Sequence, residues 1–386
     1  MTWVAHLGPV FNIWLHKPRL GLRFMGSGES VVSSKRFTSL QGLRGVAAAT
    51  VVVSHALGIF YVSGKDIGTI LESFGPISHL SGILAAKAVW VFFVLSGFVL
   101  THQLASKPIG TFRFLGSRLV RLYFPVWVAI SLNLMVIALI QRSGRVIDFW
   151  IGAHPDSITP VGLVQEFLLI PDGYFLGPLW SLKWEVAFSL LVVLFWKAKV
   201  IARFPGSTVV ASLVISTYGE LIQNGWFKYI PMFVIGMALH SMLLKIQEKR
   251  ITPRYEILAL VAAGLLPTIS NVATAEIFFG EALRYVIDVP TSLIAICVLF
   301  YVLIKGGFTS KVLETKPLQS LGDFSYSLYL FHLPLITFVF YFSNASVGWV
   351  SVAFVASFGF AYLAYRIIEI PSHNLSRLIR GRSKAA

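Results

Sequence analysis

Long apolar runs separated by short polar stretches dominate the hydrophobic pattern of the chain. A helix needs about 17–25 predominantly apolar residues to cross the hydrocarbon core of a bilayer. About ten runs approach or reach this length, and the fifth is the shortest. The runs lie at residues 40–62, 82–104, 122–140, 178–196, 208–222, 227–244, 255–273, 283–304, 324–342 and 347–369. The pattern therefore predicts an all-α, polytopic membrane protein with about ten transmembrane helices.

Composition agrees with a membrane protein and argues against a soluble one. Hydrophobic residues make up 56% of the 386-residue chain and charged residues 13%, and the mean hydropathy is +0.76. Soluble domains are about 45–50% apolar and about 25% charged. The formal net charge is +15, but no basic helix is interleaved with base-stacking aromatic residues, so we predict no nucleic-acid partner. In so hydrophobic a chain, excess Lys and Arg are typical of cytoplasmic loops next to membrane lipid.

The basic residues divide unevenly between alternate loops, which indicates how the chain is oriented. If the N-terminus is cytoplasmic, the outer loops hold only Lys65, Arg142, Arg145, Lys228 and Arg284. The other basic loop residues then lie inside, as the positive-inside rule requires. We therefore expect an even number of spans with both termini in the cytoplasm. The predicted domains are a cytoplasmic N-terminal extension (1–36), a membrane domain (37–371) and a basic cytoplasmic tail (372–386).

Some kinds of processing and chemistry are excluded by the sequence. The N-terminus has no run of small residues before a cleavage site, so we expect no secretory signal. Cys297 is the only cysteine and lies in an apolar run, which excludes an intrachain disulfide or thiolate metal cluster and favours a packing role. The nine histidines are scattered without HExxH or other ligand spacing, so we predict no metal.

The first predicted span carries two ionisable side chains, Arg44 and His55. Such groups cost at least a few kcal/mol in a membrane, so they usually face a bundle interior or wet cavity and mark function. Eleven residues of α-helix make almost three full turns and rise about 16 Å, so both side chains share one helix face. Arg44 would lie near the cytoplasmic surface and His55 deep in the bilayer. A snorkelling arginine and a core histidine are the structural alternative, but the aligned pair favours function.

A second basic pair, Arg118 and Arg121, lies at the cytoplasmic entry of the third predicted span. A spacing of three residues projects both side chains from one helix face, and two neighbouring guanidiniums can hold a phosphate group. Ordinary positive-inside anchoring would also place arginines here. Together with Arg44 on the same side of the membrane, the pair favours a cytoplasmic pocket for a phosphorylated ligand.

Further ionisable residues within the spans are Lys87 in the second and Lys183 and Glu185 in the fourth. Two roles stay open for Glu185. It either orients His55 or binds a substrate, with Ser181 one turn earlier as a hydrogen-bond partner. Alternatively, it forms a structural ion pair with Lys183 or with a cation of another span.

From about Phe37 to Pro371 the sequence resembles the acyltransferase 3 family of bacterial integral-membrane acyltransferases. Six motifs occur in the family's order, and together they are far more specific than any one alone. They are the Arg-ten residues-His pair Arg44 and His55; "VFFVLSGFVL" with Ser96 and Gly97; the Arg-x-x-Arg pair Arg118 and Arg121; "PLWSLKWEVAFSL" with Trp180, Ser181 and Glu185; "FSYSLYLFHLPL" with Ser325, Tyr329, His332 and Pro334; and "IEIP" with Glu369 and Pro371.

The resemblance implies an O-acyltransferase of the bacterial inner membrane that moves an acyl group, usually acetyl, from acyl-CoA to a hydroxyl of a sugar or glycan. It implies His55 as the catalytic residue. A general base suits a sugar hydroxyl, because neutral imidazole can remove its proton near neutral pH; a covalent acyl-histidine is the alternative. Acetyl-CoA would enter from the cytoplasm with its phosphates on Arg118 and Arg121, joined by Arg44.

The resembling motifs also supply candidate substrate contacts. Glu185 is a second candidate catalytic residue, and the candidate substrate-binding residues are Ser96, Trp180, Ser181 and His332. His332 precedes Pro334, so a kinked, packed region is the other interpretation of its position.

The fourth span departs from the family pattern. A second acid and a tyrosine often follow the glutamate, where this chain has Val186 and Ser189, and a small residue is more usual in place of Lys183. We expect these changes to alter fine substrate contacts rather than the role of Glu185.

A polytopic transporter or flippase for an envelope saccharide is the alternative function. It would share the spans, the buried charges and the helices broken by Gly and Pro. However, the sequence shows no inverted repeat and no pair of substrate sites recurring in two halves.

Overall fold

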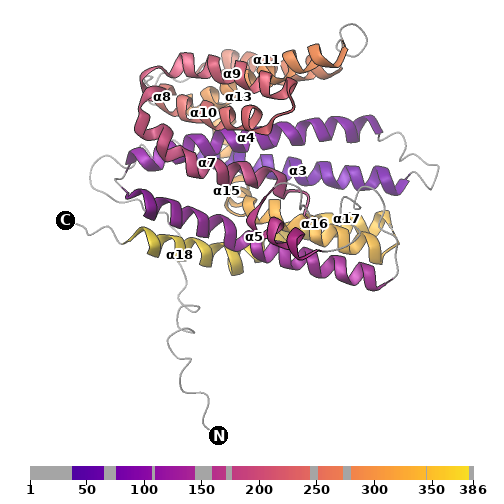
Figure 1. The fold of residues 1–386 in the computed structure, drawn as a ribbon. Helices are drawn as coiled ribbons and strands as arrows, with labels where there is room; N and C mark the ends of the chain where they lie inside the picture. Colours follow the sequence, from indigo (N-terminus) through magenta and orange to yellow (C-terminus); the bar gives the residue numbers. More distant parts are fainter. Residues whose placement is uncertain are drawn as a thin grey trace. The chain divides into compact units, whose positions relative to one another are not determined.

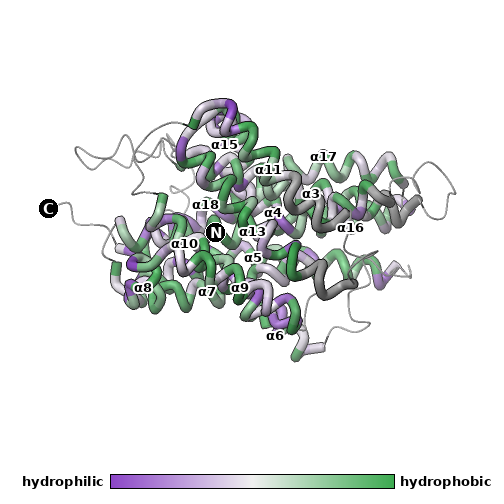
Figure 2. The backbone as a smooth tube through the Cα atoms, turned by 90° about the horizontal axis from the view of Figure 1, so that it is seen from above, coloured by the Kyte–Doolittle hydropathy of each residue, from purple (hydrophilic) through white to green (hydrophobic). Residues whose placement is uncertain are grey.

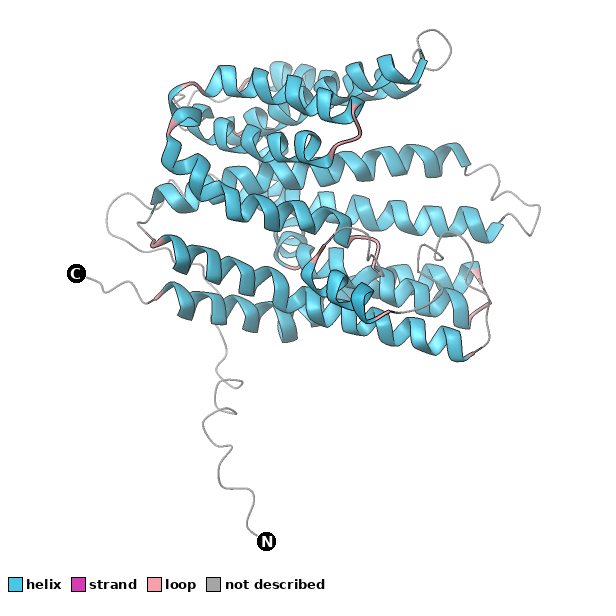
Figure 3. Cartoon of the chain, viewed as in Figure 1, coloured by secondary structure: helices cyan, strands magenta, loops and turns pink. Residues whose placement is uncertain are grey.

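The structure is a computed structural model, and it describes residues 37–64, 75–106, 109–143, 159–170, 176–243, 251–272, 280–344 and 346–381. These residues form helices and short connections, with no strand among them (Figure 3). From Thr38 onward they belong to one compact unit. The predicted N-terminal extension, residues 1–36, and residues 382–386 of the predicted tail lie outside the described residues.

A helix occurs at the place of each predicted span. The helices are α3 (Thr38–Gly64), α4 (Gly75–Ser106), α5 (Thr111–Arg142), α7 (Leu179–Ala198), α9 (Pro205–Leu221), α10 (Gly225–Leu243), α11 (Pro253–Val272), α13 (Gly280–Lys305), α16 (Ser325–Phe342) and α17 (Val347–Ala364).

Within the described residues, 8 helical segments are long and apolar enough to cross a bilayer. These are α3, α4, α5, α7, α10, α13, α16 and the segment that begins with α17. The predictions of an all-α fold and of a multi-pass membrane protein are therefore confirmed. The count of ten spans and the cytoplasmic location of both termini stay predictions.

The surface of the long helices suits a lipid environment. Leu194 on α7 is 63% exposed, Val214 on α9 is 64% exposed and Val355 on α17 is 68% exposed. Figure 2 shows hydrophobic colouring along much of the long helices. Because a helix satisfies its own backbone hydrogen bonds, it can present such side chains directly to lipid chains.

Two central helices, α3 and α4, pack against each other, and they run side by side through the helical unit in Figure 1. On one side α4 packs against α10, which packs against α9 and α13. On the other side α3 packs against α16 and α17, and α16 also contacts α5. Helix α7 contacts α4, α5 and α10, so it lies between the two groups.

Glycine residues allow α4 and α10 to approach closely. A side chain at Gly97 of α4 would collide with the backbone oxygen of Phe233, and one at Gly236 of α10 would collide with the backbone of Val94 and Phe98. Close backbone packing at small residues is a common way to join helices in membranes, where dispersion contacts replace the hydrophobic effect. This contact fixes the position of α4 beside α10.

Several short helices connect or flank the long ones. They are α6 (Pro160–Leu168), α8 (Val200–Arg203), α14 (Phe308–Leu313), α15 (Lys316–Asp323) and α18 (Ile370–Arg380). A π-helical turn, η2 (Tyr365–Glu369), joins α17 to α18. Such turns often occur at functional sites.

Helix α18 begins inside the predicted membrane domain and continues through much of the predicted tail. It lies along α5, where Ser372 Oγ donates a hydrogen bond to the backbone oxygen of Val120 at 3.1 Å. At its other end Arg380 Nε donates to Ser117 Oγ at 2.9 Å. These contacts bring the basic end of α18 next to the Arg-x-x-Arg motif of α5.

Candidate functional site

Two histidines from distant parts of the chain meet between α3 and α16. His55 Nδ1 lies 2.8 Å from His332 Nε2, and the rings stack with their centroids 5.1 Å apart. The side chain of His332 is fully buried, whereas His55 is half-buried. The structure thus joins the His of the first motif directly to the His of the fifth.

The partners of His332 determine which nitrogen of each ring carries a hydrogen. His332 Nδ1 lies 2.8 Å from the backbone oxygen of Leu328, which can only accept, so Nδ1 is the donor. Burial away from carboxylates favours a neutral ring, and the Nε2 of His332 then carries a lone pair. That lone pair must accept a hydrogen from His55 Nδ1. The same assignment leaves a lone pair on Nε2 of His55.

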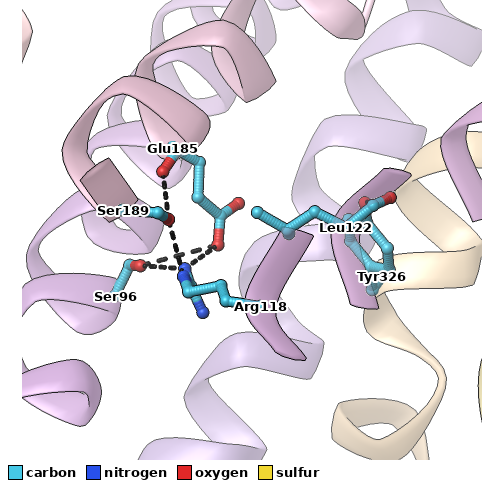
Figure 4. Close-up of polar contacts among 6 residues, drawn as sticks. All are labelled: Ser96, Arg118, Leu122, Glu185, Ser189 and Tyr326. Atoms are coloured by element: carbon cyan, nitrogen blue, oxygen red, sulfur yellow. Dashed lines mark hydrogen bonds and ion pairs between the residues drawn. The ribbon is translucent and has the colours of Figure 1, made fainter. Parts of the chain in front are cut away.

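Arg118 on α5 connects three helices, as Figure 4 shows. Its Nε donates to Ser189 Oγ of α7 at 2.6 Å. Its Nη2 donates to Ser96 Oγ of α4 at 3.0 Å and to Glu185 Oε1 of α7 at 2.8 Å. Arg118 is only 7% exposed, so a charge in this position requires such partners.

Glu185 forms an ion pair with a cation of another span, one of the two roles that the sequence left open. Its carboxylate contacts Arg118, and Ser96 Oγ lies 3.5 Å from Oε1. Ser181, by contrast, does not bond to Glu185; its hydroxyl lies 2.7 Å from the hydroxyl of Tyr329. Tyr329 also donates to the backbone oxygen of Pro178 at 3.0 Å, so Ser181 and Tyr329 join α7 to α16.

Arg44 and Arg121 lie in a cluster of mostly positive charge. Among the described residues neither guanidinium makes a hydrogen bond or a short ion pair. Arg44, Arg118 and Arg380 are all close enough to repel Arg121, whereas the buried carboxylate of Glu369 attracts it. Because cations outnumber carboxylates around Arg121, the cluster is a favourable site for an anionic group.

Glu369 is held in the π-helical turn beside these arginines. It is 1% exposed, and its Oε2 accepts hydrogen bonds from the backbone nitrogen of Ser327 at 3.2 Å and from Ser327 Oγ at 2.7 Å. Arg44 and Arg121 both stabilise its negative charge. The "IEIP" and "FSYS" motifs therefore meet at the arginine cluster.

Arg380 is a member of the cluster that the sequence analysis missed. It belongs to the predicted tail, whose basic residues we attributed to membrane orientation. The available signal was the spacing of Ser372, Ser376 and Arg380 along one face of a short helix, which the structure packs against α5.

Trp180 packs in an aromatic group at the start of α7. Its ring centroid lies 6.4 Å from that of Phe93 and 5.5 Å from that of Tyr229.

Lys87, an ionisable residue of the second predicted span, forms an ion pair with Asp288 of α13. Among the described residues no group of three or more His, Cys, Asp and Glu side chains is placed to hold a metal ion.

Comparison with known families identifies the domain. The family of acyltransferase domains called acyltransferase 3 matches residues 37–366. The chain belongs to this family. Membership agrees with the resemblance carried by the six motifs, and it favours the acyltransferase hypothesis over the transporter.

Individual relatives share modest identity with the chain. The O-acetyltransferase OatA of Staphylococcus aureus (strain NCTC 8325 / PS 47) is 24% identical over 385 residues, which cover 89% of this chain and 58% of that protein. The acyltransferase MdmB of Streptomyces mycarofaciens is 32% identical over 166 residues, which cover 42% of this chain and 40% of that protein. No solved structure matches the chain.

Replacement of Arg118 by Ala should strongly destabilise the protein. The change leaves Glu185 without its cation, and removing one partner of a buried ion pair costs about 3–5 kcal/mol. The free energy of unfolding in mixed detergent micelles measures the effect. Arg113→Ala, at an exposed position of the same helix, is the matched control and should change stability by less than about 0.5 kcal/mol. Equal stability of the two variants would contradict the structural role of Arg118.

Proposed function

We propose that the protein is a membrane O-acyltransferase that moves an acetyl group from acetyl-CoA to a hydroxyl of a sugar or glycan. The observation that carries the proposal is the contact between His55 and His332, which fixes the tautomer of His55. Family membership and the similarity to an O-acetyltransferase support the reaction type. The arginine cluster supports a donor with a phosphorylated head group.

His55 acts as the general base through its Nε2. This nitrogen removes the proton of the acceptor hydroxyl as the hydroxyl oxygen attacks the carbonyl carbon of the thioester. The tetrahedral intermediate then expels the CoA sulfur, which takes the proton back from Nε2. The products are the acetyl ester and CoA with a free thiol, so the base returns to its starting state.

His332 acts as a positioning residue. Its Nε2 accepts the hydrogen bond from His55 Nδ1, which keeps the lone pair of His55 on the opposite nitrogen. While His55 carries the extra proton, this bond also stabilises the imidazolium. The bond from His332 Nδ1 to the backbone of α16 holds the second ring in place. The arrangement serves the same purpose as the acid that orients histidine in a catalytic triad.

The phosphates of the donor bind at the arginine cluster. Arg44 and Arg121 are the principal ligands, because Arg118 is already bonded to Glu185, Ser96 and Ser189. Arg380 adds a further cation from α18. On this account Glu185 and Ser96 act mainly by holding Arg118, and Ser181 acts by fixing Tyr329 one turn before His332.

The distance between the two parts of the site suits the shape of the donor. Arg44 and His55 lie on one face of α3 with a separation of about 16 Å along the axis, given a rise of about 1.5 Å per residue. Acyl-CoA has an anionic head and a thioester at the end of a slender arm. With ten spans and both termini in the cytoplasm of a bacterial cell, the head would bind at the cytoplasmic side and the thioester would extend into the membrane.

Replacement of His55 by Ala should lower acetyl transfer about 100- to 10,000-fold, the range that a general base contributes. CoA release from acetyl-CoA with a mixture of envelope glycans measures the rate. His332→Ala should lower kcat but leave KM for acetyl-CoA unchanged. His332→Gln should recover part of kcat, because the amide oxygen can accept from His55 Nδ1. Full transfer by His55→Ala would rule out the proposed base.

Replacement of Arg121 by Ala should weaken CoA binding about tenfold or more, because hydrogen bonds to charged groups contribute about 1.5–3 kcal/mol. Isothermal calorimetry of CoA with the purified protein gives the affinity. Arg380→Ala should have a smaller effect in the same direction, and Arg113→Ala should have none. Unchanged affinity in Arg121→Ala would exclude the arginine cluster as the phosphate site.

A further inference from the structure

Helix α18 adds a row of basic side chains to the arginine cluster. His373, Arg377 and Arg380 follow Glu369 at intervals of four, four and three residues, so the four side chains share one side of the helical segment. His373 Nε2 lies 3.5 Å from Glu369 Oε1. Arg377 and Arg380, as well as arginines of α3 and α5, are close enough to His373 to interact with it electrostatically. The row therefore continues the cluster along α18.

The row extends toward the start of α5, because α18 runs beside α5 in the opposite direction (Figure 1). Near the start of α18, Ser372 bonds to the backbone oxygen of Val120. Just past its end, a side chain at Gly381 would lie 3.6 Å from the guanidinium of Arg113. Movement along α18 away from the π-helical turn is thus movement back along α5.

The histidine pair lies in the other direction along α5. The hydroxyl of Tyr326 on α16 donates to the backbone oxygen of Leu122 at 2.9 Å. Further along both helices, Ile336 and Ile140 belong to one cluster of buried side chains. His332 lies between Tyr326 and Ile336 on α16, so it is level with the part of α5 that follows Leu122. The basic end of α18 therefore lies on the far side of the Arg-x-x-Arg motif from the histidine pair.

The order of these groups matches the order of the parts of acyl-CoA. The thioester ends the pantetheine arm, the diphosphate follows, and the ribose with its 3′-phosphate comes last. With the thioester at His55 and the diphosphate at Arg44 and Arg121, the 3′-phosphate would reach Arg377 and Arg380. A phosphate monoester carries a charge of about −1.5 to −2 near pH 7, and guanidinium groups match its oxygens in geometry.

The side chains of Arg380 and Arg377 are placed to receive an anion. Arg380 Nε donates to Ser117 Oγ at 2.9 Å, which fixes the direction of the side chain. Within the described part of the chain, the two terminal nitrogens of Arg380 make no hydrogen bond or short ion pair. Arg377 is exposed, and its charge and that of Arg118 repel Arg380. A bound anion would relieve this repulsion.

We propose that Arg377 and Arg380 form a subsite for the 3′-phosphate of the donor nucleotide and so make the protein selective for CoA over 3′-dephospho-CoA. The proposal rests on the proposed function, because it concerns the donor of that reaction. It gives the arginines separate roles. Those of α3 and α5 hold the diphosphate, which both nucleotides have, and those of α18 recognise the group that distinguishes the two. The phosphate of a lipid head group is the other source of the same chemistry.

Calorimetry of CoA and 3′-dephospho-CoA with the purified full-length protein in neutral detergent tests the proposal. The wild-type protein should bind CoA about tenfold more tightly, which corresponds to about 1.4 kcal/mol. Arg380→Ala should reduce this preference to about twofold, and its affinity for 3′-dephospho-CoA should stay within about twofold of the wild-type value. Arg121→Ala should instead weaken the binding of both nucleotides and keep the preference, because it removes a ligand of the diphosphate.

Arg366→Ala is the matched control, because Arg366 is an exposed arginine of the π-helical turn whose guanidinium contacts the hydroxyl of Tyr362 at 3.4 Å. It should keep the full preference for CoA, and so should the wild-type protein after phosphatidylglycerol is added to the micelles. Loss of the preference on addition of this lipid would assign the two arginines to lipid head groups and overturn the proposal.

Two further results would overturn the proposal and leave the donor site intact. They are equal binding of the two nucleotides by the wild-type protein and an unchanged preference in Arg380→Ala. Failure of the wild-type protein to bind either nucleotide would instead reject the proposed donor site, and the 3′-phosphate subsite with it.

Discussion

A guanidinium buried among apolar helices must have its donors paired, and at Arg118 this requirement determines how three helices meet. Its partners come from the second and fourth predicted spans, Ser96 on α4 and Glu185 and Ser189 on α7. The cost of an unpaired charge in this environment is several kcal/mol. The same pairing fixes the start of α5, and with it the position of Arg121. It also fixes the face of α7 that continues to Ser181.

Two groups of polar residues lie at different levels along α3. At one level Arg44 joins Arg121 and Arg380, with Glu369 held in the π-helical turn. At the other level His55 meets His332. Helix α16 connects both levels, because Ser327 bonds to Glu369 and His332 bonds to His55. The order of these two parts along α3 matches a ligand with an anionic head and a reactive end.

Hydropathy predicted the positions of the helices well, because a lipid solvent imposes long apolar runs that are visible in the sequence. It did not predict the π-helical turn or the short helix α18. The residues of the turn have the pattern of the end of an apolar span, and most residues of α18 have that of a basic tail. The spacing of Arg44 and His55 indicated a shared face. The partner of His55 could not be derived, because a contact between residues 55 and 332 depends on tertiary packing. For the same reason the sequence left the partner of Glu185 open.

The sidedness of donor use tests the account most directly. Inverted membrane vesicles expose the cytoplasmic face, whereas spheroplasts expose the opposite one, and acetyl-CoA labelled in its acetyl group does not cross the membrane. Release of CoA and transfer of label to glycan should occur with inverted vesicles, should be absent with spheroplasts, and should be lost in His55→Ala. Transfer from acetyl-CoA supplied to spheroplasts at the rate seen with inverted vesicles would contradict a donor head bound at a cytoplasmic arginine cluster.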